Sequence, residues 1–171
     1  MKDTAILEPF FVKPMARFGV RELGRLTRVD TKTVMKYLRA STRSNIIVRR
    51  QEKGKYPYYE ANRSSLAFRH AKSEILVSKM IESGLIEYLQ STLNPKVIVL
   101  FGSVQKGTYH SESDIDLFIQ ADYSQVDLRK YNLKLGHQIH LLFDKDLKSL
   151  NHGLLENIYN GLVLAGILEV P

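Results

Sequence analysis

The sequence predicts an α+β protein, because helical and strand-like patterns occupy separate regions of the chain. Apolar residues recur at helical spacing in residues 20–38 and again in residues 66–92. Short apolar runs rich in β-branched residues lie at 96–101 and 115–119, and such runs are typical of buried strands. We therefore expect a mainly helical first half and a second half built around a β-sheet.

Charge divides the chain in a similar way. Residues 1–70 contain 16 Lys and Arg against 6 Asp and Glu, a net charge of +10, whereas residues 71–171 contain 9 against 12, a net charge of −3. This asymmetry predicts that the first half, and not the second, meets a polyanion. The expected segments are a first domain at 1–65, a connecting helix at 66–94 and a second domain at 95–171.

Composition argues against several classes of protein. The chain contains no Cys, so neither a disulfide framework nor a cysteine metal site is available to it. No apolar run approaches the ~20 residues of a membrane-spanning helix, and the start, MKDTAILEPFF, lacks the pattern of a signal peptide. We expect a soluble, cytoplasmic protein with no membrane partner.

Two short helices are predicted in the basic half. The first has apolar residues at helical spacing: Val20, Leu23 and Leu26. Asp30 is a favourable N-cap for the second helix, in which Val34, Tyr37 and Leu38 share one face. The polar side of this second helix carries Thr31, Lys32, Thr33 and Lys36.

A β-hairpin is predicted after these helices, with strand character at residues 46–48 and 56–59 and a turn at residues 52–55. Over residues 1–62, the order of elements and the basic charge resemble the winged helix-turn-helix family. That resemblance implies DNA binding, with the second helix in the major groove.

The expected DNA contacts fall into two groups. The candidates for reading base edges are Thr31, Lys32, Thr33 and Lys36. The candidates for phosphate contacts are Arg43, Arg49, Arg50, Lys53 and Lys55. RNA binding, docking to a protein and a merely solvated basic face stay open as alternatives.

Residues 66–92 predict one long helix with a wide apolar stripe, interrupted only by Gly84 and ended by Asn94 and Pro95. We expect the stripe to pack on the second domain. A contact between the two copies of a homodimer is the alternative, because winged helix proteins often meet DNA as two-fold dimers.

The segment VLFGSVQKGTYHSESDIDLFI, residues 99–119, carries the chemistry of the second half. Gly102 allows a sharp turn directly after a predicted strand. Ser103 would begin a helix, where its hydroxyl and the free backbone amides can hold a phosphate. Lys106 follows closely and could neutralise phosphate charge.

Two carboxylates, Asp114 and Asp116, lie in the next predicted strand. On a strand they point to the same face, about 7 Å apart. Carboxylates this close repel each other unless a cation lies between them, and Mg²⁺ binds one or two carboxylates together with substrate phosphates. The pattern therefore predicts that Gly102 and Ser103 hold a nucleotide's phosphates while the two Asp residues hold Mg²⁺ or Mn²⁺.

A Gly-Ser pair, ten residues and Asp-x-Asp, bracketed by apolar strands, resemble the minimal nucleotidyltransferase family of the polymerase-β-type superfamily, which includes small archaeal and bacterial proteins. The likeness covers residues 100–117, and the family domain would cover about 95–171. It implies a mixed β-sheet with helices on one side. It also implies transfer of a nucleoside monophosphate from an NTP to a hydroxyl, with Asp114 and Asp116 binding two Mg²⁺ ions.

The chain departs from that family at one position. A third carboxylate is expected on a later strand, here residues 137–144, but His140 stands in its place and Asp144 lies about 13 Å further along. His140 has three interpretations: a general base, a weak metal ligand, or a structural residue in a site that has lost catalysis.

The end of the chain, residues 147–167, predicts a buried helix face made of Leu154, Leu155, Ile158, Leu162 and Val163.

Two hypotheses for the whole protein follow. In the first, an enzyme nucleotidylates a protein acceptor or partner toxin, with DNA binding for autoregulation or localisation. In the alternative, a DNA-binding transcription regulator or antitoxin-like protein keeps a catalytically degenerate nucleotidyltransferase domain.

Overall fold

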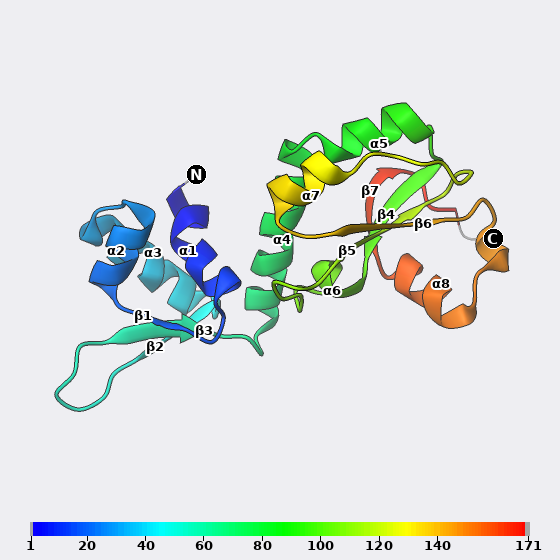
Figure 1. Cartoon of the computed structure of the whole chain (residues 1–171). Helices are drawn as coiled ribbons and strands as arrows, with labels where there is room; N and C mark the ends of the chain where they lie inside the picture. Colours follow the sequence, from blue (N-terminus) through cyan, green and yellow to red (C-terminus); the bar gives the residue numbers. More distant parts are fainter. Residues whose placement is uncertain (1, 170–171) are drawn as a thin grey trace. The chain divides into compact units, whose positions relative to one another are not determined.

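The computed structural model describes residues 2–169. The chain forms two compact units, and the boundary between them lies at Lys72 and Ser73, inside a helix. Figure 1 shows the elements of each unit. No helix within residues 2–169 is long and apolar enough to cross a membrane.

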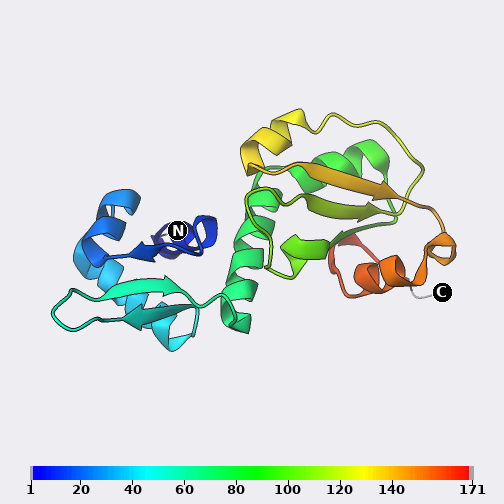
Figure 2. The ribbon, with the colours of Figure 1, turned by 60° about the horizontal axis from the view of Figure 1, so that its bottom comes forward.

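The first unit combines helices with a three-stranded antiparallel sheet in which β3 lies between β1 and β2. Figure 2 shows β2 and β3 running side by side to a long loop. The elements, in chain order, are α1 (Lys2–Val12), β1 (Arg17–Phe18), α2 (Val20–Thr27), α3 (Thr31–Arg43), β2 (Ile47–Arg50) and β3 (Tyr58–Ala61).

Apolar faces of all three helices meet in the core of this unit, which includes Ile6, Phe10, Leu23, Val34 and Leu38. Asp30 caps α3 as predicted, because its carboxylate accepts a hydrogen bond of 2.9 Å from the backbone N–H of Thr33. Leu26 is exposed although it shares the helical spacing of Leu23. The buried face of α2 is therefore narrower than the spacing of its apolar residues predicts.

The connecting segment is two helices rather than the single predicted one. These are α4 (Leu66–Glu82) and α5 (Leu85–Leu93). Gly84 separates them with a φ of +80°, in the left-handed region that favours glycine. The hydroxyl of Ser83 accepts a hydrogen bond of 3.2 Å from the N–H of Leu85, the first residue of the second helix.

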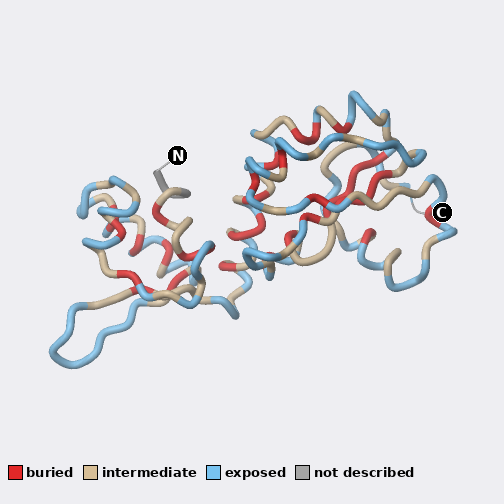
Figure 3. The backbone as a smooth tube through the Cα atoms, in the orientation of Figure 1, coloured by how far each residue is buried: buried red, intermediate tan, exposed pale blue. Residues whose placement is uncertain are grey.

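The second unit is built on a four-stranded mixed sheet in the order β6-β5-β4-β7. β4 is antiparallel to both of its neighbours, whereas β5 and β6 are parallel. Figure 3 shows buried positions concentrated along the central strands β4 and β5. The four strands are β4 (Val97–Phe101), β5 (Ile115–Ile119), β6 (Ile139–Phe143) and β7 (Leu162–Gly166).

Helices cover both faces of this sheet, so the expectation of helices on one side only is wrong. Helices α5 and α7 (Arg129–Leu135) pack with Ile98 and Leu100 on one face. On the other face, α8 (His152–Tyr159) and a 3₁₀ turn (Leu147–Ser149) pack with alternate residues of β4 and β5. Since β4 is apolar on both faces, each face must be covered.

The prediction that residues 154–163 form one helix face is wrong for Leu162 and Val163. Helix α8 ends at Tyr159, and the next residues form the edge strand β7. Leu162 and Val163 belong to that strand and are 43% and 41% exposed. The short apolar run 162–168 fits either a helix or a strand by periodicity, and pairing with β4 selects the strand.

Candidate functional site

The pairing of β4 with β5 brings the glycine turn against a carboxylate. Phe101 at the end of β4 is paired with Asp116 of β5, and Gly102 follows with a φ of +76°. A Cβ atom at Gly102 would lie 2.5 Å from Oδ2 of Asp116. The backbone conformation therefore favours glycine, and a Cβ atom would also require the Asp116 carboxylate to shift.

Ser103 and Lys106 lie directly after this turn. Ser103 belongs to α6 (Gly102–Gln105), a single helical turn, and its hydroxyl makes no hydrogen bond within the described chain. The ammonium of Lys106 instead donates to Oδ1 of Asn157 in α8, at 3.2 Å. Ser103 thus has a free hydroxyl beside Gly102, whereas Lys106 is held by α8.

Asp116 is a half-buried carboxylate on the sheet face that α8 covers. Burial raises its pKa, the nearby His140 opposes that shift, and the negative charge of Asp114 raises the pKa further. Asp114 itself is exposed, one residue before β5 begins. Among the described side chains, residues 5–169, no Lys or Arg forms an ion pair with Asp116, so its negative charge is poorly compensated.

His140 lies beside Asp116 because β5 and β6 pair in parallel with these two residues opposite each other. Nδ1 of His140 is 3.7 Å from Oδ1 of Asp116, and the His140 side chain is 67% exposed. His140 is therefore a solvent-facing neighbour of the carboxylate and not a core residue.

Asp144 is engaged elsewhere. Its carboxylate accepts hydrogen bonds from the Ser149 hydroxyl at 2.5 Å and from the Asp146 N–H at 2.8 Å. The Ser149 hydrogen bond, more than the Asp146 one, lowers the pKa of Asp144. Asp144 thus stabilises the turn after β6 and supplies no third carboxylate to Asp116.

The carboxylates fit a metal that is shared with a substrate. Among the side chains that the structure describes, residues 5–169, there is no cluster of three or more His, Cys, Asp or Glu able to hold a metal. Mg²⁺ commonly binds one or two carboxylates and completes its shell with water and substrate phosphates. Asp114 and Asp116 fit this arrangement, because the uncompensated charge on Asp116 is a charge that a cation would neutralise.

One nearby residue, His137, was not singled out from the sequence. Its Nδ1 lies 2.8 Å from the carbonyl oxygen of Ser113, and its ring contacts Tyr109 edge-on at 5.5 Å. His137 therefore ties β6 to the loop that carries Asp114. A hollow of about 280 Å³ lies beside it, between residues 111–114 and 136–138. The only sequence signal was its place at the start of the HQIH run.

The polar side of α3 forms a shallow groove in the first unit. Thr31, Lys32, Thr33, Lys36 and Arg43, all predicted contact residues, line it together with Met35 and Arg39. Arg39 is a further exposed cation that the sequence argument did not include.

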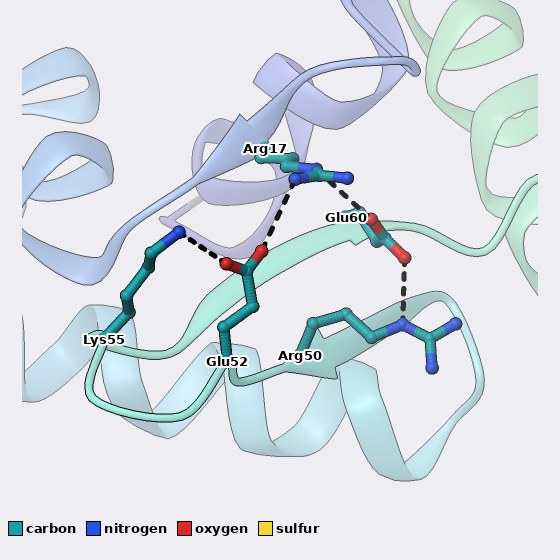
Figure 4. Close-up of polar contacts among 5 residues, drawn as sticks. All are labelled: Arg17, Arg50, Glu52, Lys55 and Glu60. Carbon is teal, nitrogen blue, oxygen red and sulfur yellow. Dashed lines mark hydrogen bonds and ion pairs between the residues drawn. The ribbon is translucent and has the colours of Figure 1, made fainter.

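The cations of the hairpin divide into paired and unpaired ones. Figure 4 shows Arg17 between Glu52 and Glu60, with Lys55 on Glu52 and Arg50 on Glu60. The shortest of these contacts is the 2.6 Å ion pair from Lys55 to Glu52. Acidic neighbours therefore already neutralise Arg50 and Lys55.

The two other predicted hairpin contacts have no acidic partner in the part of the chain that is described. Arg49 donates to Gln51 at 2.7 Å, and Lys53 makes no ion pair. Both side chains are exposed. Arg49 and Lys53 therefore keep a full positive charge toward solvent.

Residues 83–166 match the family model described as Polymerase beta, Nucleotidyltransferase. No curated protein and no solved structure matches the chain. The matched range contains the whole four-stranded sheet, the glycine turn and both carboxylates. It supports a nucleotidyltransferase domain in these residues, a family that generally uses an NTP and a divalent metal.

Proposed function

We propose that this protein transfers a nucleoside monophosphate from an NTP to a hydroxyl group of a partner molecule, with Mg²⁺ or Mn²⁺ bound. The hydroxyl oxygen bonds to the α-phosphorus, the bond to the β-phosphate breaks, and pyrophosphate leaves. The observation that carries the proposal is the contact of Gly102 with Asp116. A phosphate held at the glycine turn would lie next to the carboxylates, where a shared cation would have ligands from both.

Each residue has a distinct role in this proposal. The free hydroxyl of Ser103 donates a hydrogen bond to a phosphate oxygen, and Gly102 lets the backbone approach that phosphate. Asp114 and Asp116 hold the cation, which supplies charge neutralisation for the phosphates when it is bound. Catalysis is then mainly positioning and electrostatic stabilisation.

His140 is placed to accept a proton. It is exposed beside Asp116, and the unprotonated ring nitrogen of a neutral imidazole can accept a proton. We assign it the removal of the proton from the acceptor hydroxyl, a role within hydrogen-bond reach of a group bound next to Asp116. A protein, including a partner toxin, is one class of acceptor with suitable hydroxyls.

We also propose that the first unit binds DNA through α3. The support is the groove along α3 and its exposed cations, Lys32, Lys36, Arg39 and Arg43. Phosphate contacts of this kind give affinity that falls with salt, whereas the polar side chains at the start of α3 are positioned to read base edges.

A second candidate function rests on the missing third carboxylate. Since His140 stands where the family places an acid, the domain is suited to bind nucleotide without turning it over. The chain would then be a DNA-binding regulator or antitoxin-like protein whose second unit senses nucleotide or contacts a partner.

Calorimetric titration of Mg²⁺-ATP, and then of the other NTPs, tests the nucleotide site. We expect binding to the wild type and its loss in Asp114→Asn/Asp116→Asn. Glu74→Gln/Glu87→Gln is the matched control, because it removes the same charge from exposed glutamates of the same unit. A wild type that binds no NTP would refute the enzyme and leave the DNA-binding regulator.

A further inference from the structure

The first unit contains a hollow that resembles a ligand site. It lies between the start of α2, the start of α3 and the tip of the hairpin, with a volume of about 460 Å³. That volume falls in the range of about 300–1,000 Å³ that is common for small-ligand sites. Apolar atoms from Val20, Met35, Tyr56 and Pro57 form much of its lining, and Arg21, Glu22 and Arg25 lie at the same hollow. The Glu22 carboxylate accepts a hydrogen bond of 3.2 Å from the backbone N–H of Gly19.

Tyr56 is unusual in its exposure. Its side chain is 89% exposed, and it makes no hydrogen bond, ring contact or cation–π contact in the described structure. Met35 on the facing helix is also exposed, at 40%. Neither residue therefore serves the core of the unit, and both present apolar surface to whatever enters the hollow.

The hairpin tip that carries Tyr56 makes ion pairs. Lys55, its neighbour, forms an ion pair with Glu52, and Glu52 also contacts Arg17 of β1. These ion pairs connect the loop to β1 (Figure 4), and the exposed ring of Tyr56 extends from this loop.

The hollow carries two cations, Arg21 and Arg25, against one carboxylate, Glu22, and this net positive charge favours an anionic ligand. Arg21 and Arg25 have no ion pair in the described chain, unlike the neutralised cations of the hairpin. The hollow also shares Thr31 and Met35 with the cationic groove along α3, so the two form one continuous surface. A planar apolar group could bind in the hollow, and a polyanion attached to it could bind along the cationic groove.

We infer that this hollow takes an unpaired nucleotide of a DNA strand that is bound along α3. The base stacks on Tyr56 and contacts Met35, while Arg21 and Arg25 contact the adjacent phosphates. A base inside a duplex presents only its edges, whereas an unpaired base has a free face for an aromatic ring. The inference rests on the proposed DNA binding by the first unit.

Fluorescence anisotropy with the full chain tests the inference. Three labelled DNA probes of related sequence are compared: a single strand, a blunt duplex, and the same duplex with one unpaired adenine. We expect the probes with unpaired bases to bind more tightly than the blunt duplex. Tyr56→Ala should weaken their binding by about tenfold or more and leave the duplex affinity nearly unchanged.

Two controls make the result specific. Tyr123→Ala removes another exposed tyrosine, from the second unit, and should change no affinity. A 2-aminopurine at the unpaired position should be quenched on binding to the wild type and less so on binding to Tyr56→Ala, since stacking causes the quenching.

The possible results distinguish a failure of this inference from a failure of the proposed DNA binding. Equal binding of all three probes, or an equal loss for all three in Tyr56→Ala, would overturn the inference and leave DNA binding intact. A wild type that binds none of the probes would overturn both.

Discussion

At the scale of single residues, the site depends on one glycine. Gly102 combines a φ of +76° with an approach to Asp116 at which a Cβ atom would displace the carboxylate. Gly136 has a similar φ of +71° at the end of α7, but a Cβ atom there would meet nothing within 4 Å. Comparing Gly102 with Gly136 therefore separates two effects of a substitution: the strain of a positive φ, which both share, and the contact with the Asp116 carboxylate, which only Gly102 has.

We predict that Gly102→Ala destabilises the protein more than Gly136→Ala. The control should lower the free energy of unfolding by about 1–2 kcal/mol, the cost of a left-handed conformation for a residue with a Cβ atom. Gly102→Ala adds the clash with Asp116, and replacing Asp116 by Ala in the same chain should recover that extra cost. Urea unfolding of the wild type, Gly102→Ala, Gly136→Ala, Asp116→Ala and Gly102→Ala/Asp116→Ala measures these differences, and equal costs at both glycines would contradict the contact.

His140 is the residue at which the sequence predicts a departure from the family pattern. It faces Asp116 across parallel strands, so a carboxylate at this position would share the space with Asp114 and Asp116. Three carboxylates repel one another without a cation and form a better site with one.

We predict that His140→Asp lowers the melting temperature without Mg²⁺ and makes it rise on addition of Mg²⁺. At a tenfold excess of Mg²⁺ over its Kd, the expected gain is about 1.4 kcal/mol. His70→Asp is the control, because His70 is exposed and lies in the first unit. A melting temperature of His140→Asp that does not respond to Mg²⁺ would place the metal elsewhere.

At the scale of elements, α3 and the hairpin carry similar numbers of cations in different electrostatic states. Lys32 and Lys36 on α3 have no ion-pair partner within the described residues. Arg50 and Lys55 on the hairpin are paired with Glu60 and Glu52. Exposed pairs of this kind contribute only about 0–1 kcal/mol to stability, so their main effect here is on the local charge.

We predict that Lys32→Ala/Lys36→Ala weakens DNA binding more than Arg50→Ala/Lys55→Ala. The first variant should reduce the slope of log K against log salt concentration by about 2, since each lost phosphate contact removes about 0.9. Both variants remove the same formal charge, so each is the control of the other. Anisotropy titrations across a salt series measure the slopes, and equal slopes would show that the hairpin pairs open on binding.

At the scale of the whole molecule, the two candidate sites belong to different compact units. The carboxylates lie in residues 73–171 and the cationic groove in residues 1–72, each unit with its own core. Changes at positions that share no partners are usually additive within about 0.3–0.5 kcal/mol.

We predict that substitutions at the nucleotide site do not change DNA binding, and that substitutions at the DNA site do not change nucleotide binding. Asp114→Asn/Asp116→Asn should leave the Kd for DNA within about twofold of the wild type, and Lys32→Ala/Lys36→Ala should do the same for Mg²⁺-ATP. Calorimetry and anisotropy on both variants and on their combination check this. A larger cross-effect would reveal coupling between nucleotide binding and DNA binding.

The sequence by itself determined the local elements and the candidate chemistry. Apolar runs identified β4 and β5, Asp30 identified the start of α3, and the spacing from Gly102 to Asp116 pointed to the nucleotidyltransferase match at residues 83–166. These signals are local, because periodicity, capping and turn chemistry act over a few residues.

Tertiary structure decided what depends on residues far apart in the chain. Pairing with β4 makes residues 162–166 a strand, although the same apolar run fits a helix. Packing on both faces of the sheet places α8 opposite α5. Ion pairs between β1, the hairpin loop and β3 neutralise cations that look free in the sequence. Periodicity cannot show which neighbours meet, since long-range pairing and charge compensation arise only when the chain is folded.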